Sequence, residues 1–550
     1  MSNADNLTQA YIEELQSLEK FRLTHSTLYH DTPLETEDPY TKRLIEALAF
    51  FGAKARVAGV NRITEIHQRL FRQYFPYLVN ALPTFGMIQV KPSIRFPERV
   101  TLNAGTELSF KTSSEFKAMF QTLDPLVVFP LFLKTFQFER QQSGGWRCLM
   151  EYASLHISTE EVGSLKLYVN HLNNFLSSLK LSFAMVRCLK QVRVFYDDSL
   201  GKEEGLECSM RFGFDAGERK VFYHEIEQLR SLLHLPQQEL FMTFDIPPHE
   251  KRWQSFTLCL DFDEKWPEFT FLNSDSLVPF VVPVINLKSS PAEPITCDGT
   301  KDSYLVLHPD PIYKFELHTL QSVFELIPGS KKMITPGILG DGSESFEIDY
   351  FKQELLIDLP GAFENPKTLY TEALWTQPSF VEHVNSELDL HCAEAATCGL
   401  EVKLLDALYR AEKTIEDDPN FLIRILSLKN QSSLNLNEIL FILKAMKNLN
   451  NSVFYTLLDT IRELKTQQKR DEKSHQFITE YAFYLKDLGD QKWELAVLFF
   501  KYLHRLLNSW LPNIEIETKV YFSESKKPLI IKQGDGYELP ALARNFFLSQ

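Results

Sequence analysis

The spacing of apolar residues changes near residue 86, and this change constrains the fold more than any other feature of the sequence. Before it, Leu44, Leu48, Phe51 and Ala55 recur every three or four residues, which places them on one face of a helix. After it, short apolar runs are separated by Pro and Gly, a pattern typical of strands. We therefore expect a helical N-terminal segment followed by β-rich domains.

The first ninety residues are expected to form three helices. An apolar stripe marks the first helix: Leu7, Tyr11, Leu15 and Leu18. Asp38 followed by Pro39 predicts the start of the second, because Asp caps free backbone N–H groups and Pro fits the first helical position. The third is expected from about Ile63 to Phe75, where Pro76 should end or kink it.

Strands are predicted through the middle of the chain, with helices near residues 173–189 and 223–235. The predicted strands lie at 87–90, 100–108, 127–138, 164–169, 192–196, 240–244 and 256–262. Residues 401–510 are predicted to be helical again, with one stripe formed by Leu404, Leu405, Leu408 and Ala411. The charged run from Lys465 to Lys473 is interpreted as a solvated helix face or loop. Strands at 514–522 and 529–531 are expected to close the chain.

These patterns predict an α+β fold that is elongated and multi-domain. At 550 residues, and with about 150 residues per domain as a prior, the chain should hold three or four domains. The expected boundaries give an N-terminal helical domain (1–90), a mixed α/β domain (91–246), a β-rich domain (247–400) and a C-terminal helical domain with terminal strands (401–550).

Charge, cysteine usage and the distribution of apolar residues indicate which partners the chain can bind and which compartment it occupies. The formal net charge is −15, and clusters of Lys and Arg are few, so nucleic acid and anionic membrane surfaces are not expected to bind. The seven cysteines are odd in number and mostly far apart, which favours reduced thiols over a disulfide framework. The N-terminus resembles no signal peptide, and no apolar stretch approaches the roughly 20 residues that span a bilayer. A soluble cytoplasmic protein is expected.

No segment of the sequence matches a catalytic or metal-binding motif. The glycine-rich stretch 337–342 matches neither a dinucleotide fingerprint nor a phosphate-binding loop, and a turn is its favoured interpretation. His224-Glu225 lacks the second His of a zinc-peptidase helix. His391, Cys392 and Cys398 lack an evident fourth metal ligand. The acids Asp261, Asp263 and Glu264 fit the polar side of an exposed strand. We expect no enzyme, no catalytic or cofactor-binding residues, no metal and no cofactor.

Segments spread along residues 38–310 resemble one known family. The opening helix of that family is matched by Asp38-Pro39 and Arg43 to Ala47, and a turn signature of the form Leu-x-Ala-Gly-Thr-x-Leu by Leu102 to Leu108. Other matches are Pro76, Pro83, Gln89, Phe120 to Thr122, Pro130-Leu131, Leu165 to Asn170 and Pro236 to Asp245. The most specific block comprises Pro283 to Leu287, Ala292 to Ile295, Asp298-Gly299, Tyr304 and Pro309-Asp310. Leu426 to Leu428, Gly536 and Pro540 are weaker matches.

The family is TssF, the baseplate subunits of type VI secretion systems. Two departures are visible: His171-Leu172 stand where the family usually has Gly-Asp, and Cys392 to Thr397 replaces a polar stretch. The matched residues form turns and cores rather than reactive groups, as expected of a structural part.

The resemblance implies a structural wedge component of the baseplate, docked on the inner-membrane secretion complex. Its implied partners are TssG-like and TssK-like subunits, further copies of the chain, and sheath, tube and membrane-complex proteins. We expect Leu44, Leu48, Phe51, Phe71 and Phe75 to be either core or partner interface. The alternatives are a wedge protein of a phage-like contractile particle, or a cytosolic hydrolase whose site joins scattered residues such as Asp261 and His391.

Overall fold

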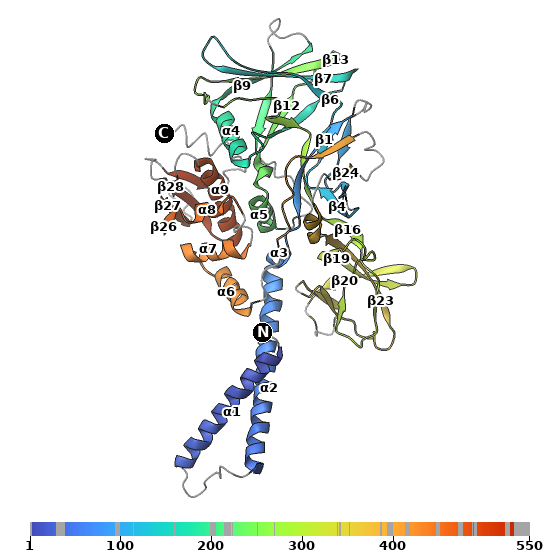
Figure 1. Cartoon of the computed structure of the whole chain (residues 1–550), viewed down its shortest axis with the longest axis vertical. Coiled ribbons are helices and arrows are strands. Elements are labelled where there is room, and N and C mark those ends of the chain that lie inside the picture. Colours follow the sequence, from blue (N-terminus) through green and yellow to red (C-terminus); the bar gives the residue numbers. More distant parts are fainter. Residues whose placement is uncertain are drawn as a thin grey trace. The chain divides into compact units, whose positions relative to one another are not determined.

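The computed structural model divides the chain into two compact units (Figure 1). The first contains residues 1–76 and 416–430, and the second contains residues 77–415 and 431–550. The structure describes residues 3–532 apart from 29–38, 94–98, 114, 159, 198–204, 214–221, 223, 250, 269, 338, 340–342, 351, 385–387, 393–399, 413–417, 447–451, 471–476, 487, 489–491 and 523–527. Helices followed by several β-sheets confirm the predicted α+β class. The boundaries of the four predicted domains remain a prediction.

The first unit is built from helices α1 (Asn3–Leu28), α2 (Pro39–Tyr74) and α6 (Pro419–Lys429). The prediction of separate second and third helices is wrong, because α2 runs through both without a break. Gly59, which lies between the two apolar stripes, is tolerated inside the helix at a cost of about 1 kcal/mol relative to Ala. Pro39 is the first residue of α2, as predicted, whereas Asp38 lies outside the described residues.

Small side chains mediate the contact between α1 and α2. Ala10, Ala49 and Ala53 are buried there, so the two backbones can approach closely. Arg56 adds ion pairs to Glu13 and Glu14, at 3.0 and 3.5 Å between Nη1 and the carboxylate oxygens. Phe50 of α2 also contacts Tyr11 of α1, with ring centroids 6.5 Å apart.

The second unit is organised around a six-stranded sheet assembled from distant segments. Its order is β24 (Asp389–Cys392), β3 (Glu107–Lys111), β4 (Lys117–Thr122), β15 (Val281–Ile285), β1 (Phe85–Pro92) and β25 (Leu400–Leu404). All five residues of β15 are buried. The prediction of a helix with Leu404, Leu405, Leu408 and Ala411 on one face is wrong. This segment is extended, and Tyr409 exchanges backbone hydrogen bonds with Phe85.

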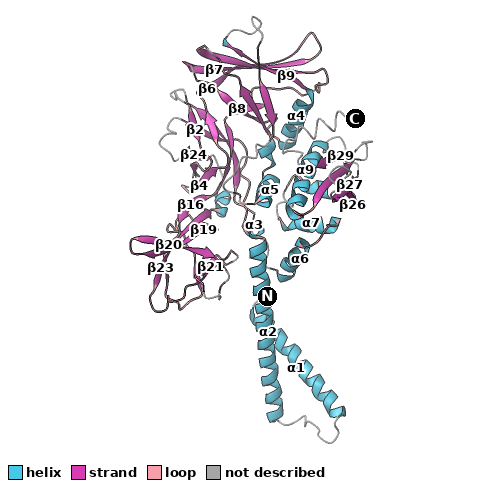
Figure 2. Ribbon diagram, turned by 180° about the vertical axis from the view of Figure 1, so that it is seen from behind, coloured by secondary structure: helices cyan, strands magenta, loops and turns pink. Residues whose placement is uncertain are grey.

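Two further sheets are formed by strands within residues 131–279 (Figure 2). The five-stranded sheet has the order β10 (Leu206–Glu207), β9 (Leu189–Tyr196), β13 (Trp253–Phe262), β7 (Trp146–Ser158) and β6 (Leu131–Arg140). The four-stranded sheet has the order β11 (Ser209–Phe212), β12 (Phe241–Ile246), β8 (Gly163–Val169) and β14 (Leu277–Pro279). Strands β2 (Val100–Leu102) and β5 (Leu126–Val128) pair separately. Helices α4 (Phe175–Cys188) and α5 (Glu225–His234) and the 3₁₀ helix η2 (Pro236–Glu239) lie between strands of these two sheets, whereas α3 (Pro76–Val79) precedes β1.

An eight-stranded sheet is inserted between two strands of the six-stranded sheet, after β15 and before β24. It contains β16 (Lys288–Pro291), β17 (Ile295–Cys297), β18 (Ser303–Leu305), β19 (Glu316–Ile327), β20 (Ser330–Pro336), β21 (Ser345–Asp349), β22 (Glu354–Asp358) and β23 (Lys367–Thr376). Its core is apolar and includes Val323, Leu355, Leu369 and Trp375. The 3₁₀ helix η3 (Pro378–His383) follows and leads back to the six-stranded sheet.

The C-terminal part packs helix α9 (Trp493–Trp510) on one face of a four-stranded sheet. The order of the sheet is β26 (Ile461–Arg470), β27 (Phe477–Leu485), β28 (Glu515–Tyr521) and β29 (Leu529–Lys532). Helices α7 (Leu436–Ala445) and α8 (Tyr455–Leu458) precede it. The interpretation of Lys465–Lys473 as helix or loop is wrong for its described part, which belongs to the edge strand β26. Its charged side chains are exposed at that edge, where Lys discourages pairing with other strands.

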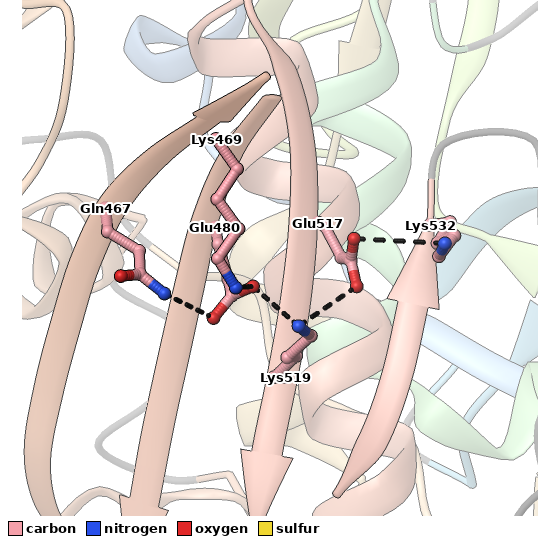
Figure 3. A network of polar contacts seen from close by, with 6 residues as sticks. All are labelled: Gln467, Lys469, Glu480, Glu517, Lys519 and Lys532. Atoms are coloured by element: carbon pink, nitrogen blue, oxygen red, sulfur yellow. Dashed lines mark hydrogen bonds and ion pairs between the residues drawn. The ribbon is translucent and has the colours of Figure 1, made fainter. Parts of the chain in front are cut away.

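A buried glutamate joins three strands of this C-terminal sheet (Figure 3). The Glu480 side chain is 5% exposed, and its Oε2 lies 2.5 Å from Nζ of both Lys469 and Lys519. Gln467 donates a hydrogen bond to its other oxygen at 3.1 Å. Burial alone would raise the pKa of Glu480, but these donors outweigh it and lower the pKa to about 2.

Candidate partner-binding surface

Helix α2 exposes a stripe of large apolar side chains to solvent. Leu44, Leu48 and Phe51 are 61%, 53% and 67% exposed, and Tyr40 one turn earlier is also exposed. Their spacing of three or four residues places them on one face of the helix. We call these four residues the α2 stripe.

A second set of exposed apolar side chains follows along the same helix. It consists of Val60, Ile63, Ile66, Leu70 and Tyr74. These residues have helical spacing in the sequence but were not predicted to form an interface. Helix α1 adds exposed Phe21 and Leu23. Soluble monomers rarely expose large contiguous apolar patches, so this density of exposed side chains favours a protein-binding role for the helices.

The other two residues of the predicted interface lie inside the chain. Phe71 and Phe75 are fully buried, with ring centroids 5.1 Å apart. Helix α6 packs against α2 and buries its own Leu422 and Ile425. The structure thus places Phe71 and Phe75 in the core and leaves Leu44, Leu48 and Phe51 on the surface.

The residues of the alternative hydrolase site do not form a site together. Asp261 lies on β13 of the five-stranded sheet, where Arg147 and Arg193 each donate to it at 2.7 Å. Burial alone would raise the pKa of Asp261, but these hydrogen bonds outweigh it and hold the pKa below its usual value. His391 lies on β24 of a different sheet, exposed and 2.9 Å from Asp389. An ion-paired carboxylate and a surface histidine on separate sheets do not share a reacting position.

The remaining motifs have structural roles or lie partly outside the described residues. His224 caps α5 by accepting a hydrogen bond from the Ile226 N–H at 3.1 Å, and its ring stacks on Tyr77. Glu225 receives a hydrogen bond from Ser509 at 2.7 Å. Cys398 and most of the 337–342 stretch are outside the described residues.

The described part of the chain shows neither a cluster of metal ligands nor a helix suited to a membrane. No group of three or more His, Cys, Asp or Glu side chains there is arranged to hold a metal ion. None of the helices described there has the length and apolar character needed to cross a membrane.

The sequence itself assigns the family. The family model for the type VI secretion system protein TssF matches residues 5–336, which is more than half of the chain. The chain belongs to the TssF family. No curated protein sequence matches it. The α2 stripe of this TssF-family chain lies within the matched region.

Solved structures share the fold of this TssF-family chain. A chain of a TssK-TssF-TssG baseplate subcomplex from a type VI secretion system, determined by cryo-electron microscopy, aligns with a TM-score of 0.71 and 16% identity. The alignment covers 91% of this chain and 99% of that one. A chain of a type VI baseplate complex aligns with a TM-score of 0.57 and 14% identity, covering 96% and 98%. At these identities the likeness establishes the fold.

Proposed function

We propose that this chain is a structural wedge component of a type VI secretion baseplate. It assembles with TssG-like and TssK-like subunits and with further copies of itself. The observation that carries the proposal is the family match together with a fold shared, over almost its full length, with a chain of a TssK-TssF-TssG subcomplex. The family match favours a type VI system over a phage-like contractile particle.

The α2 stripe is the proposed contact with another subunit. Its exposed leucine and phenylalanine side chains would gain roughly 1.5–3 kcal/mol each on complete burial. The α1–α2 contact is made by buried alanines, the ion pairs of Arg56 and the Tyr11–Phe50 ring contact. None of these residues belongs to the stripe, so a partner can cover the stripe without opening that contact. A helical partner would add its own apolar stripe to this surface.

The proposed role is mechanical, without catalysis. The Asp261 ion pairs hold strands of one sheet together, and this supports a scaffold role for the residues of the hydrolase alternative. We place the protein in the cytoplasm, docked on the inner-membrane secretion complex through its assembly. Sheath, tube and membrane-complex proteins are the further proposed neighbours.

Co-expression of the tagged chain with the TssG-like and TssK-like proteins encoded by neighbouring genes tests this function. Size-exclusion chromatography with mass determination should give one stable complex that contains all three proteins. A monomeric chain that binds neither protein at micromolar concentration would contradict the proposal. A parallel purification with an unrelated tagged cytoplasmic protein controls for capture by the resin.

A further inference from the structure

Strand β6 forms one edge of the five-stranded sheet and has the length and composition that favour pairing with another strand. Among the described strands, β6 and β26 are the two sheet edges that reach ten residues. Charged side chains protect β26, whereas residues 135–138 of β6 contain neither a charge nor a proline. An exposed edge of this kind pairs readily with an added strand.

The hydrogen bonds of the β6–β7 hairpin show which backbone groups of β6 face outwards. The N–H of Gln141 donates to the carbonyl oxygen of Gly145 at 2.8 Å, and this pair continues the register of the two strands. In an antiparallel pair, such residues alternate with residues whose N–H and C=O groups point away from the partner strand. Phe136 and Phe138 therefore direct these groups away from β7, where they have no hydrogen-bond partner among the described residues.

The apolar face of the five-stranded sheet is incompletely covered at β6. Phe136 and Phe138 lie opposite residues of β7 that are fully buried, but both phenylalanines remain partly exposed. The ring of Phe138 stacks on Trp146, with centroids 5.0 Å apart, and Trp146 in turn contacts Phe271, which is 59% exposed. A strand added beside β6 would bring apolar side chains over Phe136 and Phe138, and aromatic residues of this kind are enriched at protein interfaces.

A cavity of about 540 Å³ lies at the start of the same strand. Residues 131–133 of β6 line it, together with Lys91 of β1 and Lys403 of β25. Both lysines are exposed, and neither forms an ion pair within the described part of the chain, although Glu401 lies opposite Lys91 in the register. Two ammonium groups and one carboxylate, that of Asp275, give the described lining a net positive charge, which favours an acidic group.

We propose that β6 pairs with an extended segment of a partner protein, whose apolar side chains cover Phe136 and Phe138 and whose carboxylate enters the cavity beside Lys91 and Lys403. The outward backbone groups select an extended chain, and the partly covered phenylalanines select apolar residues at alternate positions. The two lysines select an acidic residue at one end of the segment. This surface is separate from the α2 stripe and does not depend on the proposed baseplate function.

Selection of short random peptides displayed on phage, with the purified full-length chain as the target, tests this surface. Prior depletion on the Phe138→Ser chain removes peptides that bind elsewhere. Enriched peptides should alternate apolar and polar residues and carry Asp or Glu near one end. A synthetic copy of the most enriched peptide then serves as the probe in fluorescence anisotropy. Binding of the probe should slow hydrogen–deuterium exchange in peptic fragments that contain residues 135–140, because strand pairing occupies their outward amides.

Two substitutions at one position separate the contribution of the backbone from that of the ring. Phe136→Ala removes the ring but keeps the N–H group, and should weaken probe binding about tenfold. Phe136→Pro also removes the outward N–H group, which an edge strand tolerates, and should weaken binding by a further severalfold. Lys403→Gln removes one ammonium group of the cavity and should weaken binding severalfold. Lys190→Gln, an exposed lysine of β9 outside the lining, is the matched control and should leave binding unchanged.

Thermal melts of each variant separate lost binding from lost folding, and Phe136→Ala with Lys403→Gln keeps the test valid if the proline variant fails to fold. Absence of enriched peptides, or enriched peptides that lack the alternation and the acidic residue, would overturn the proposal. Probe binding that Phe136→Ala and Lys403→Gln leave unchanged would also overturn it. A dimer of the chain alone that Phe136→Pro dissociates would overturn it in favour of a second copy as the occupant of this edge.

Discussion

Lys501 and Glu239 form an ion pair inside the second unit, with 3.1 Å between Nζ and Oε2 and side chains only 4% and 1% exposed. Lys501 lies on α9 and Glu239 lies at the end of η2, so the pair joins the C-terminal helix to the segment that leads into β12. Because both charges are removed from water, the loss of either one leaves the other buried without a counter-ion.

Loss of one partner of this pair should be strongly destabilising. Lys501→Met leaves the Glu239 carboxylate buried without its cation and should lower the free energy of unfolding by about 3–5 kcal/mol. Arg62→Met, which breaks the exposed Arg62–Glu65 pair, is the matched control and should cost less than about 1 kcal/mol. Urea denaturation followed by circular dichroism measures both. Similar losses in the two variants would contradict the assigned role of burial.

The Glu480 cluster should make stability depend on pH in the acid range. Its folded pKa of about 2 lies below the ordinary value of 4.5, so the stabilisation is complete above about pH 5 and is lost as pH falls toward 2. Glu480→Gln should therefore cost about 2–3 kcal/mol at pH 7 and progressively less at lower pH. Unfolding by urea at pH 7, 5, 4 and 3 measures this trend. The cost of Glu463→Gln, on the exposed edge strand, should be the same at each of these pH values. A cost of Glu480→Gln that does not change with pH would refute the prediction.

The backbone at residue 172 should favour glycine over alanine. Leu172 has φ of +56°, in the left-handed region, and its side chain is 74% exposed. The Cβ atom is unfavourable there by about 1–2 kcal/mol, and the greater freedom of glycine in the unfolded chain offsets part of this. Leu172→Gly should therefore be more stable than Leu172→Ala by about 0.5–1 kcal/mol. Paired melting curves decide this, and equal stability would show that the turn adopts another conformation in solution.

Substitutions on α2 should distinguish its exposed residues, which we expect to affect partner binding, from its buried residues, which we expect to affect stability. Leu44→Ser with Phe51→Ser should change the stability of the isolated chain by less than about 1 kcal/mol and weaken partner binding by at least tenfold. Phe71→Ala should cost about 3–5 kcal/mol of stability, because it creates a cavity in the core. Urea melts and a pull-down with the TssG-like partner give the two readouts. Lys54→Ser, an exposed polar position on the same helix, is the control. Unchanged partner binding in the double variant would exclude the α2 stripe as an interface.

Local patterns predicted the helical N-terminus and many of the strands, because these depend on the spacing of neighbouring side chains. The start of α2 at Pro39 and the strands β8 and β12 are examples. Features set by distant partners were not predictable. Leu404 to Ala411 has helical spacing, but Leu404 pairs with Ile88 and Tyr409 pairs with Phe85. Strand β26 can keep its charged side chains exposed because it lies at the edge of a sheet.

For the candidate sites too, features set by neighbouring residues were predictable from the sequence and features set by distant residues were not. Leu44, Leu48 and Phe51 of the α2 stripe were predicted from their spacing, whereas Tyr40 was not. Only the structure separates exposed Phe51 from buried Phe71.

A cavity lined by Asn80, His318 and Glu412 has no local signature, since its wall combines segments more than two hundred residues apart. Asn80 precedes an ordinary Ala-Leu-Pro, and no spacing rule connects it with His318.

The eight-stranded sheet leaves the six-stranded sheet after β15 and returns to it at β24. Both ends of the insertion are thus anchored in one sheet, and the strands that hold it come from three separate stretches of chain. Descendants of such a protein can lengthen, shorten or exchange the inserted sheet without changing the order of strands beneath it. Evolution can alter what this insertion presents to its neighbours while the supporting framework remains the same.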